Sequence, residues 1–148
     1  MWIFKDKPIH DSIQNIPEDA IGFLYKITHI NSGKWYIGRK MLYKSITRQK
    51  AGKKIKSKVE SDWKEYNSSS AELQEWIKNE GEDKFKKEIL IFVTTKAAMT
   101  YGEEYLLYST GSLFDPLNMN QNIRAKIYRK WFGKTPNLHS ELKSILFQ

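Results

Sequence analysis

The chain has 148 residues, which is enough for one domain with a hydrophobic core and short for two. A hydrophobic content of 40% with 14% aromatic residues excludes a disordered chain, and the absence of cysteine excludes disulfides and thiolate zinc sites. The formal net charge of +8 indicates a polyanionic partner.

Neither a secretion signal nor a membrane-spanning segment is expected. Residues 1–6 hold too short an apolar stretch for a signal peptide, and no later apolar run could span a bilayer. The three histidines are scattered without metal-ligand spacing, so we do not expect a histidine zinc site. These features and the lack of cysteine suit a cytoplasmic protein without a membrane partner.

The first predicted elements are an arm and a β-hairpin. Pro8 and Pro17 break any long element in residues 1–20, which we therefore expect to form an N-terminal arm. Next, β-branched and aromatic residues flank an Asn-Ser-Gly turn, which predicts two short strands over about residues 22–38. This hairpin would bring Tyr25 and Tyr36, which are eleven positions apart, close together in space.

A basic segment follows the hairpin directly. Nine basic residues and no acidic residue lie in the range 39–58, and an Ala-Gly pair at 51–52 suggests an irregular middle. A single charge run is more often a solvated face. Here a second basic stretch occurs late in the chain, and the first begins beside the tyrosine pair. The two together favour a surface that binds nucleic acid.

The second half of the chain predicts helix, strand and helix. Ser69 and Glu72 have the spacing of a capping box, and a helix that begins there would end at Gly81. The unbroken apolar run at 89–93 predicts a buried central strand over about residues 85–93.

Thr94 or Thr95 could then begin a helix that lasts to about Thr110. The order hairpin, helix, strand, helix predicts an α/β (α+β) domain with a small, mainly antiparallel sheet.

A glutamate on this last helix falls among apolar side chains. Met99, Leu106 and Leu107 share one helix face with Glu103, whereas Glu104 lies beside a stripe of tyrosines. A carboxylate on an apolar face needs a counter-charge, because burial of an unpaired charge costs several kcal/mol. From the pattern alone, an ion pair with one of the many lysines explains this glutamate as well as a functional role does.

The tyrosine hairpin resembles that of the GIY-YIG nucleases. Residues 22–25 read Gly-Phe-Leu-Tyr and residues 36–38 read Tyr-Ile-Gly, with the spacing, the turn and the terminal glycine of that family. The first half departs from the family name, which implies Gly-Ile-Tyr. The resemblance continues through residues 61–66 (Ser-Asp-Trp-Lys-Glu-Tyr) and Ser69-Ser70, a segment similar to phage-encoded members. It ends near residues 120–123, so that it covers about residues 20 to 123.

The resemblance implies a fold and a domain layout. A GIY-YIG domain has a three-stranded sheet flanked by helices, with the active site on one face. We therefore expect a nuclease domain over residues 21–123, preceded by the arm of residues 1–20. Residues 124–148 would form a basic C-terminal extension.

The resemblance also implies a chemistry: a DNA endonuclease that depends on Mg²⁺ (or Mn²⁺) and hydrolyses a phosphodiester bond directly. Glu103 would be the metal ligand, and a shift of one residue would give this role to Glu104. Tyr25 and Tyr36 would position or deprotonate the attacking water. A tyrosine with a pKa near 10 is a poor base at neutral pH, so a nearby cation would have to lower that pKa. Without the family, both tyrosines are ordinary strand residues that pack one face.

The family further places an arginine on a helix after the hairpin, where it holds the scissile phosphate. Arg48 lies near the expected place, and Arg39, Lys40 and Lys64 are its rivals. The remaining cations of this region are expected to bind the DNA backbone: Lys44, Lys50, Lys53, Lys54 and Lys56, with Lys64 again an option.

An asparagine closes the family's domain and braces the site by hydrogen bonds. Asn120 or Asn122 would match it, although turn formation after Pro116 explains either asparagine equally well.

The expected partner is double-stranded DNA in the cytoplasm, which would be that of a bacterial host cell for a phage-borne enzyme. A phage or mobile-element source fits the segment at residues 61–66, with a homing or restriction role. Residues 123–148 are too few for a separate DNA-binding domain, so specificity would come from the basic segment, the tail or homodimerisation.

Two rival functions use the same residues. The first is a non-catalytic DNA-binding protein on the same scaffold, which would bind DNA without Mg²⁺-dependent nicking. The second is an RNA-directed binder or nuclease, in which Trp2, Trp35, Trp63 and Trp131 would stack on bases. The tryptophans are spread widely along the chain, which favours packing in the core.

Overall fold

The computed structural model describes residues 1–9, 16–124 and 127–146. Its strands are β1 (Trp2–Phe4), β2 (Lys7–Pro8), β3 (Gly22–His29), β4 (Trp35–Met41), β5 (Tyr43–Lys50), β6 (Lys53–Glu60), β7 (Phe85–Val93), β8 (Asn122–Ile123) and β9 (Ile127–Tyr128). Its helices are α1 (Ala71–Glu80), α2 (Lys96–Ser109) and α3 (Leu138–Leu146), with 3-10 turns η2 (Glu82–Lys84), η3 (Ser112–Phe114) and η4 (Arg129–Phe132).

The main sheet has five strands in the order β2-β1-β7-β3-β4. The predicted three-stranded core is present, because β3 pairs antiparallel with both β4 and β7. The expected strand number is nevertheless wrong, since β1 adds to β7 in parallel and β2 pairs with β1. The mixed α/β class is confirmed, and the sheet is larger than three strands.

The start of the chain joins the sheet because of one buried tryptophan. Trp2 is almost fully buried, and its ring packs edge-on against Phe23 and Tyr25 with 5.2 Å between ring centroids in each pair. Its indole Nε1 donates a 2.7 Å hydrogen bond to the Trp63 carbonyl. The first part of the predicted arm is therefore built into the domain, while part of that arm (residues 10–15) lies outside the described residues.

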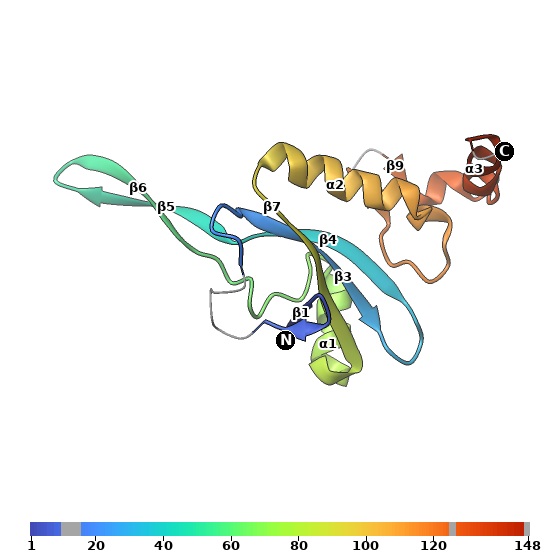
Figure 1. Ribbon diagram of the computed structural model, residues 1–148, viewed down its shortest axis with the longest axis horizontal. Helices are drawn as coiled ribbons and strands as arrows, with labels where there is room; N and C mark the ends of the chain where they lie inside the picture. Colours follow the sequence, from blue (N-terminus) through green and yellow to red (C-terminus); the bar gives the residue numbers. More distant parts are fainter. Residues whose placement is uncertain (10–15, 125–126, 147–148) are drawn as a thin grey trace.

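Two apolar layers cover the two faces of the sheet (Figure 1). Alternate residues of a strand point to opposite faces, so Phe23, Tyr25 and Ile27 pack with α1. Leu24 on the same strand instead packs against Met99 of α2. Figure 1 accordingly shows α1 and α2 on opposite sides of the sheet. Side chains at the edge strand β4 can thus meet groups from both layers.

The helix starts agree with the predicted caps to within one residue. α1 begins after Ser70, whose Oγ accepts a 3.3 Å hydrogen bond from the Leu73 amide, so Ser69 is not the cap. Thr95 caps α2 and accepts a 3.0 Å bond from the Ala98 amide. The predicted strand over residues 85–93 coincides with β7, which lies inside the sheet between β1 and β3. The expected burial of its whole apolar run is wrong, because Leu90 and Ile91 are exposed.

The basic segment forms a two-stranded ribbon instead of an irregular loop. β5 and β6 pair antiparallel from Tyr43 opposite Glu60 to Lys50 opposite Lys53. Ala51 and Gly52 connect the strands with positive φ angles of 52° and 77°, which is the geometry of a tight hairpin turn. In Figure 1 the ribbon projects from the body of the protein.

Arg129, in the predicted C-terminal extension, binds the backbone at the end of the domain. The Arg129 guanidinium donates hydrogen bonds of 2.8–3.2 Å to backbone carbonyls between η3 and β8, namely those of Ser112, Leu113, Asp115, Asn118 and Asn120. Four of these acceptor residues are buried: Ser112, Leu113, Asn118 and Asn120. Arg129 therefore belongs to the folded domain and is not a solvated charge.

We expect Arg129→Ala to lower the free energy of unfolding by about 2–4 kcal/mol, because several buried carbonyls lose their donor. Urea denaturation would measure the change. The control is Lys130→Ala on an exposed side chain, for which we expect a change within about 0.5 kcal/mol. Equal effects of the two substitutions would contradict this role of Arg129.

Candidate active site

The two tyrosines of the hairpin lie on one face of the sheet. In the β3–β4 register Tyr25 is opposite Gly38, and Tyr36 is opposite Ile27. Both phenol rings therefore point toward the α1 layer, with 6.3 Å between their centroids. The structure thus brings Tyr25 and Tyr36 together as the hairpin pattern predicts.

Gly38 leaves the space that Tyr25 occupies. A Cβ atom at Gly38 would lie 2.3 Å from the Tyr25 hydroxyl and 2.5 Å from its Cζ atom. The ring therefore extends over the backbone of β4, which a side chain at position 38 would block. This close approach explains physically why a glycine closes the Tyr-Ile-Gly sequence.

The Tyr25 hydroxyl is a buried polar atom without a hydrogen-bond partner among the described residues. Such atoms are rare in folded proteins because they lose their bonds to water. Burial raises the pKa of Tyr25 far above its ordinary value, and the neighbouring Tyr36 adds to this effect. Tyr25 is therefore a protonated phenol with an unused capacity for hydrogen bonding.

Tyr36 lies closer to the surface and has a partner. Its hydroxyl shares a 2.9 Å hydrogen bond with Ser69, the serine that does not cap α1. Burial raises the pKa of Tyr36 as well, although the bond to Ser69 opposes the shift. Neither phenol is thus prepared to act as a base at neutral pH, and both are suited to donate hydrogen bonds.

Residues 61–70 form the wall opposite the tyrosines. The Tyr66 ring lies edge-on to Tyr25 at 6.1 Å, and the Lys40 ammonium lies 4.0 Å from the centre of the Tyr66 ring. Lys40 also donates a 2.6 Å bond to the Asp62 carboxylate. Lys40 is therefore a cation that the structure brings to the tyrosine face of the site.

A buried lysine holds this wall in place. The Lys87 side chain is fully buried on β7, and its ammonium donates to Asn67 at 2.9 Å and to Glu82 at 3.3 Å. Burial lowers the pKa of Lys87, whereas the charge of Glu82 opposes this shift. The bond to Asn67 fixes the residue next to Tyr66.

Glu103 approaches the same edge strand from the α2 layer. Its side chain is 22% exposed, and its carboxylate lies 3.8 Å from the Arg39 guanidinium on β4. Burial raises the pKa of Glu103, and the charge of Arg39 opposes the shift. The negative charge of Glu103 is close enough to contribute to the raised pKa of both Tyr25 and Tyr36.

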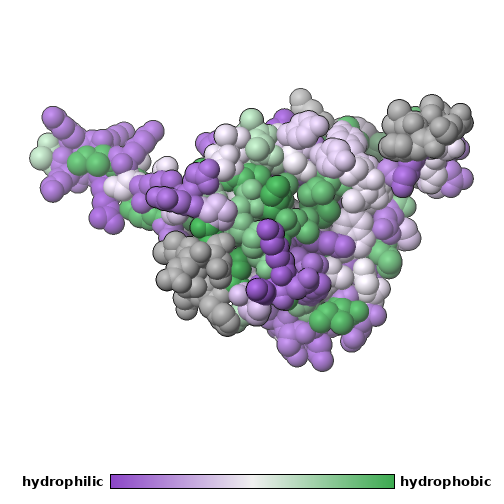
Figure 2. All heavy atoms as spheres, viewed as in Figure 1, coloured by the Kyte–Doolittle hydropathy of each residue, from purple (hydrophilic) through white to green (hydrophobic). Residues whose placement is uncertain are grey.

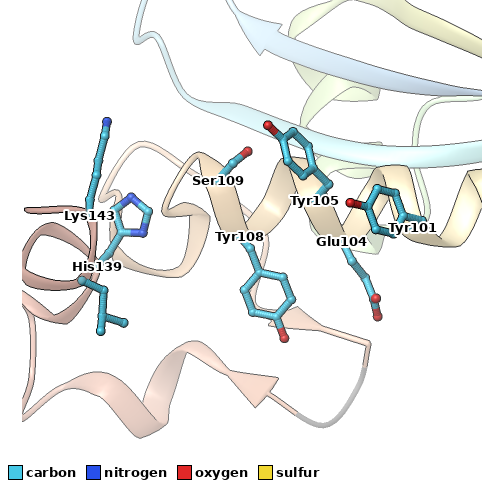
Figure 3. A pocket seen from close by; sticks show the side chains of 8 residues that line it. Tyr101, Glu104, Tyr105, Tyr108, Ser109, His139 and Lys143 are labelled. Carbon is cyan, nitrogen blue, oxygen red and sulfur yellow. The ribbon is translucent and has the colours of Figure 1, made fainter. Parts of the chain in front are cut away.

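Glu104 belongs to a different surface. It forms a 2.9 Å ion pair with Arg124 and lines a groove between α2 and α3. Figure 3 shows Glu104 beside Tyr101 and Tyr105, with His139 of α3 on the other side of the groove. The structure therefore brings Glu103, and not Glu104, to the hairpin.

The predicted phosphate-binding cations occupy separate places. Arg39 follows the tyrosine hairpin on β4 and also donates a 3.1 Å bond to Thr100 of α2. Arg48 lies on β5, six residues beyond Leu42, which is roughly 20 Å along an extended strand. The expected helix after the hairpin is replaced by the ribbon, and this removes Arg48 from the tyrosines.

Lys64 is engaged elsewhere, with an ion pair of 3.5 Å to Glu60 and a contact to the Trp63 ring. The other predicted DNA contacts are exposed side chains on the ribbon: Lys44, Lys50, Lys53, Lys54 and Lys56.

Asn120 braces the edge strand at the middle of the Tyr-Ile-Gly sequence. Its Oδ1 accepts a 3.0 Å bond from the Ile37 amide, and its Nδ2 donates a 2.8 Å bond to the Ile37 carbonyl. Asn118 supports this arrangement with a 3.0 Å bond to the same Oδ1. Asn122 instead lies in β8, opposite Tyr128. Of the two predicted asparagines, Asn120 has the bracing geometry.

The donor set fits a hard divalent cation that binds through few protein ligands. No group of three or more His, Asp or Glu side chains gathers at one point within the described ranges. Mg²⁺ binds by one or two carboxylates and completes its octahedron with waters and substrate oxygens. Glu103 supplies one such carboxylate, and the unpaired Tyr25 hydroxyl lies within the influence of its charge.

Several site residues are missed by sequence reasoning. Tyr66, Ser69 and Thr100 reach the site only through tertiary contacts. Tyr66 and Ser69 belong to the segment that already resembles the family, which is the one signal that could have pointed to them.

A sheet edge with paired phenols on one side and a helical carboxylate on the other defines the class of domain. Residues 2–132 match the family model described as "Putative endonuclease segE, GIY-YIG domain". The chain therefore belongs to the GIY-YIG family of endonuclease domains, which confirms the predicted resemblance and extends it in both directions.

Comparisons with curated proteins and with solved structures gave no match. Within the described part of the chain, no helix has the length and apolar character needed to cross a membrane.

We expect Gly38→Ala to lower the free energy of unfolding by about 1–3 kcal/mol, because the added methyl group overlaps the Tyr25 ring. Thermal or urea unfolding would measure it. Gly133→Ala is the control, since no heavy atom lies within 4 Å of a Cβ placed there. A stability equal to that of Gly133→Ala would contradict the close packing of Tyr25 on β4.

Proposed function

We propose that the protein is a metal-dependent endonuclease that hydrolyses phosphodiester bonds in double-stranded DNA. The observation that carries the proposal is the position of Glu103, whose carboxylate lies 3.8 Å from the Arg39 guanidinium on β4. Its charge also contributes to the raised pKa values of both phenols. Membership of an endonuclease family supports the reaction class. We further propose Glu103 as the ligand of the divalent cation, Mg²⁺ or Mn²⁺.

The cations of β4 would bind the scissile phosphate. Arg39 is half-exposed beside Glu103, so its guanidinium can bind a phosphate bidentately while the carboxylate holds the metal. A divalent cation at Glu103 would polarise the phosphate and stabilise the leaving oxygen. Lys40 lies on the tyrosine side of the same strand and is the second candidate for a phosphate contact.

The phenols would orient the attacking water and not deprotonate it. Both have raised pKa values because of burial, and the charge of Glu103 adds to the shift. A protonated Tyr25 can donate a hydrogen bond to a water or a phosphate oxygen, and its hydroxyl has no partner among the described residues. Tyr36 and Ser69 form a hydrogen-bonded pair beside it. Asn120 keeps β4 in position for both roles.

DNA binding would involve the ribbon together with the active-site edge. The ribbon lysines are exposed and point into solvent on both of its faces. Exposed lysines bind phosphates and release counterions, so the affinity should fall steeply with salt. A cytoplasmic location, a phage or mobile-element source, a homing or restriction role and a homodimer remain predictions from the sequence.

We expect Glu103→Ala to abolish plasmid nicking in Mg²⁺ while the affinity for DNA stays within about threefold of wild type. The reason is that the carboxylate would hold the metal, whereas the lysines bind the backbone. Chelation of the metal should stop wild-type nicking in the same assay.

The matched control is Glu104→Ala, which removes an equal charge from the neighbouring position on α2 and should leave nicking intact. Normal nicking by Glu103→Ala would remove the proposed metal site. DNA binding without any wild-type nicking in Mg²⁺ or Mn²⁺ would favour the non-catalytic rival.

We expect Tyr25→Phe to slow cleavage by at least about a hundredfold, because the substitution removes the hydrogen-bond donor that would orient the water or the phosphate oxygen. The packed ring is kept. Single-turnover cleavage would measure the rate, and an unchanged melting temperature would exclude misfolding. Tyr101→Phe, on the exposed side of α2, should cleave at the wild-type rate. A wild-type rate for Tyr25→Phe would mean that the hydroxyl has no part in the reaction.

A further inference from the structure

The β5–β6 ribbon is joined directly to the active-site strand. β4 ends at Met41 and β5 begins at Tyr43, with the buried Leu42 between them. The Leu42 amide donates to the Ile21 carbonyl at 2.9 Å, and the Ser61 amide donates to the Leu42 carbonyl at 2.9 Å. Both ends of the ribbon are thereby fixed to the body, so its orientation relative to the site is set by the fold.

The ribbon has two chemically different faces. Residues that are directly opposite in an antiparallel pair share one face. The first, which we name the polar face, carries hydroxyl and amide groups on β5 opposite a row of lysines on β6: Ser45, Thr47 and Gln49 opposite Lys58, Lys56 and Lys54. At the base of the ribbon the same face carries Tyr43 opposite Glu60. The second, the mixed face, combines aliphatic side chains with cations: Ile46, Ile55 and Val59 with Ser57, Lys44, Arg48, Lys50 and Lys53.

We propose that the polar face of the ribbon enters the major groove of double-stranded DNA and reads the base sequence. The proposal rests on the proposed function, because it names the part of the chain that would select the cleavage site. The major groove is about 12 Å wide and accepts a two-stranded β-ribbon, whose strands are about 4.8 Å apart.

The side chains of the polar face match the groups that the groove displays. Ser45, Thr47 and Gln49 each carry a group that donates and accepts, as recognition of mixed base edges requires. These groups occupy alternate positions of one strand, about 6.6 Å apart, which is close to two base-pair steps. Lys54 and Lys56 flank them and can neutralise phosphates at the groove wall.

The mixed face is the less suitable of the two for the groove floor. Ile46, Ile55 and Val59 have no group that hydrogen-bonds to a base edge, and their contact would desolvate donors and acceptors of the bases. Figure 2 shows hydrophilic and hydrophobic residues on the projecting ribbon, with a small apolar area within a largely hydrophilic surface. In the proposed orientation this area and Arg48 face away from the bases.

The length of the ribbon limits the distance between the bases that are read and the bond that is cleaved. Thr47 lies eight residues beyond Arg39, the proposed phosphate-binding residue, which is at most roughly 26 Å along an extended chain. The base pairs that are read should therefore lie within about eight base pairs of the scissile phosphate, at 3.4 Å per step.

Site selection from a random duplex pool tests the proposal with the full chain in metal-free buffer. Wild type should enrich a sequence motif, whereas the double variant Thr47→Ala/Gln49→Ala should bind the pool within about threefold of wild type but enrich no motif. The matched control, Ile55→Thr/Ser57→Ala on the mixed face, should enrich the wild-type motif. The same motif from the polar-face variant, or no motif from wild type, would overturn the proposal.

Methylation of the selected duplex tests whether the ribbon binds in the major or the minor groove. Methyl groups on guanine N7 lie in the major groove and should block binding, whereas those on adenine N3 lie in the minor groove and should not. The reverse pattern would overturn the proposal.

Removal of lysine charges tests which face of the ribbon contacts DNA. Lys54→Gln/Lys56→Gln should reduce the slope of log affinity against log salt by about 1.8, and Lys50→Gln/Lys53→Gln on the mixed face by less than half of that. Equal reductions would contradict the chosen orientation.

Plasmid nicking by wild type separates the two proposals. Metal-dependent nicking together with an unchanged motif from Thr47→Ala/Gln49→Ala would remove the reading role of the ribbon and leave the nuclease assignment intact. Motif selection by the polar face without any nicking would remove the nuclease assignment and support the reading role.

Discussion

The half-buried carboxylate of Glu103 beside the edge strand β4 is the constraint on which the candidate active site depends. Its burial disfavours the charged form, and Arg39 at 3.8 Å provides only part of the compensation. A carboxylate kept in such a place can gain stabilisation from a further positive charge. In the proposed function a divalent cation would supply that charge, which would explain why an acidic residue is tolerated on an otherwise apolar helix face.

The edge position of β4 lets both layers of the domain contribute to one site. Tyr25 and Tyr36 come from the layer that packs on α1, and Glu103 comes from α2. An edge strand exposes unpaired backbone groups, and Asn120 satisfies those of Ile37 with its side-chain amide. Arg129 in turn fixes the segment that carries Asn120. The residues that brace β4 and the residues of the candidate site are therefore connected through the same edge strand.

The sequence predicted the elements whose patterns are local. The tyrosine hairpin, the central strand over residues 85–93 and the start of α2 all follow from residue types near one another in the chain. β1 was not predicted, because three residues show no period and their partner β7 is more than eighty positions away. The ribbon was missed because lysines occupy both of its faces and hide the alternation that marks a strand.

Only those residues of the candidate site that belong to a recognisable sequence motif could be predicted. The tyrosine pair and the glutamate follow from the resemblance, whereas Tyr66, Ser69 and the space above Gly38 exist only once distant segments pack together. The choice between Glu103 and Glu104 shows what sequence periodicity cannot decide. Helical periodicity puts the two residues on different faces, but the contact with Arg39 on β4 is what assigns Glu103 to the hairpin.

Paramagnetic line broadening by Mn²⁺ tests the central claim most directly. Substoichiometric Mn²⁺ should broaden the backbone amide signals of Gly38 and Arg39 more strongly than that of Gly52 at the ribbon turn, and Glu103→Gln should abolish the difference. Equal broadening throughout, or broadening at Gly38 that persists in Glu103→Gln, would contradict a metal site formed by Glu103 beside the two tyrosines.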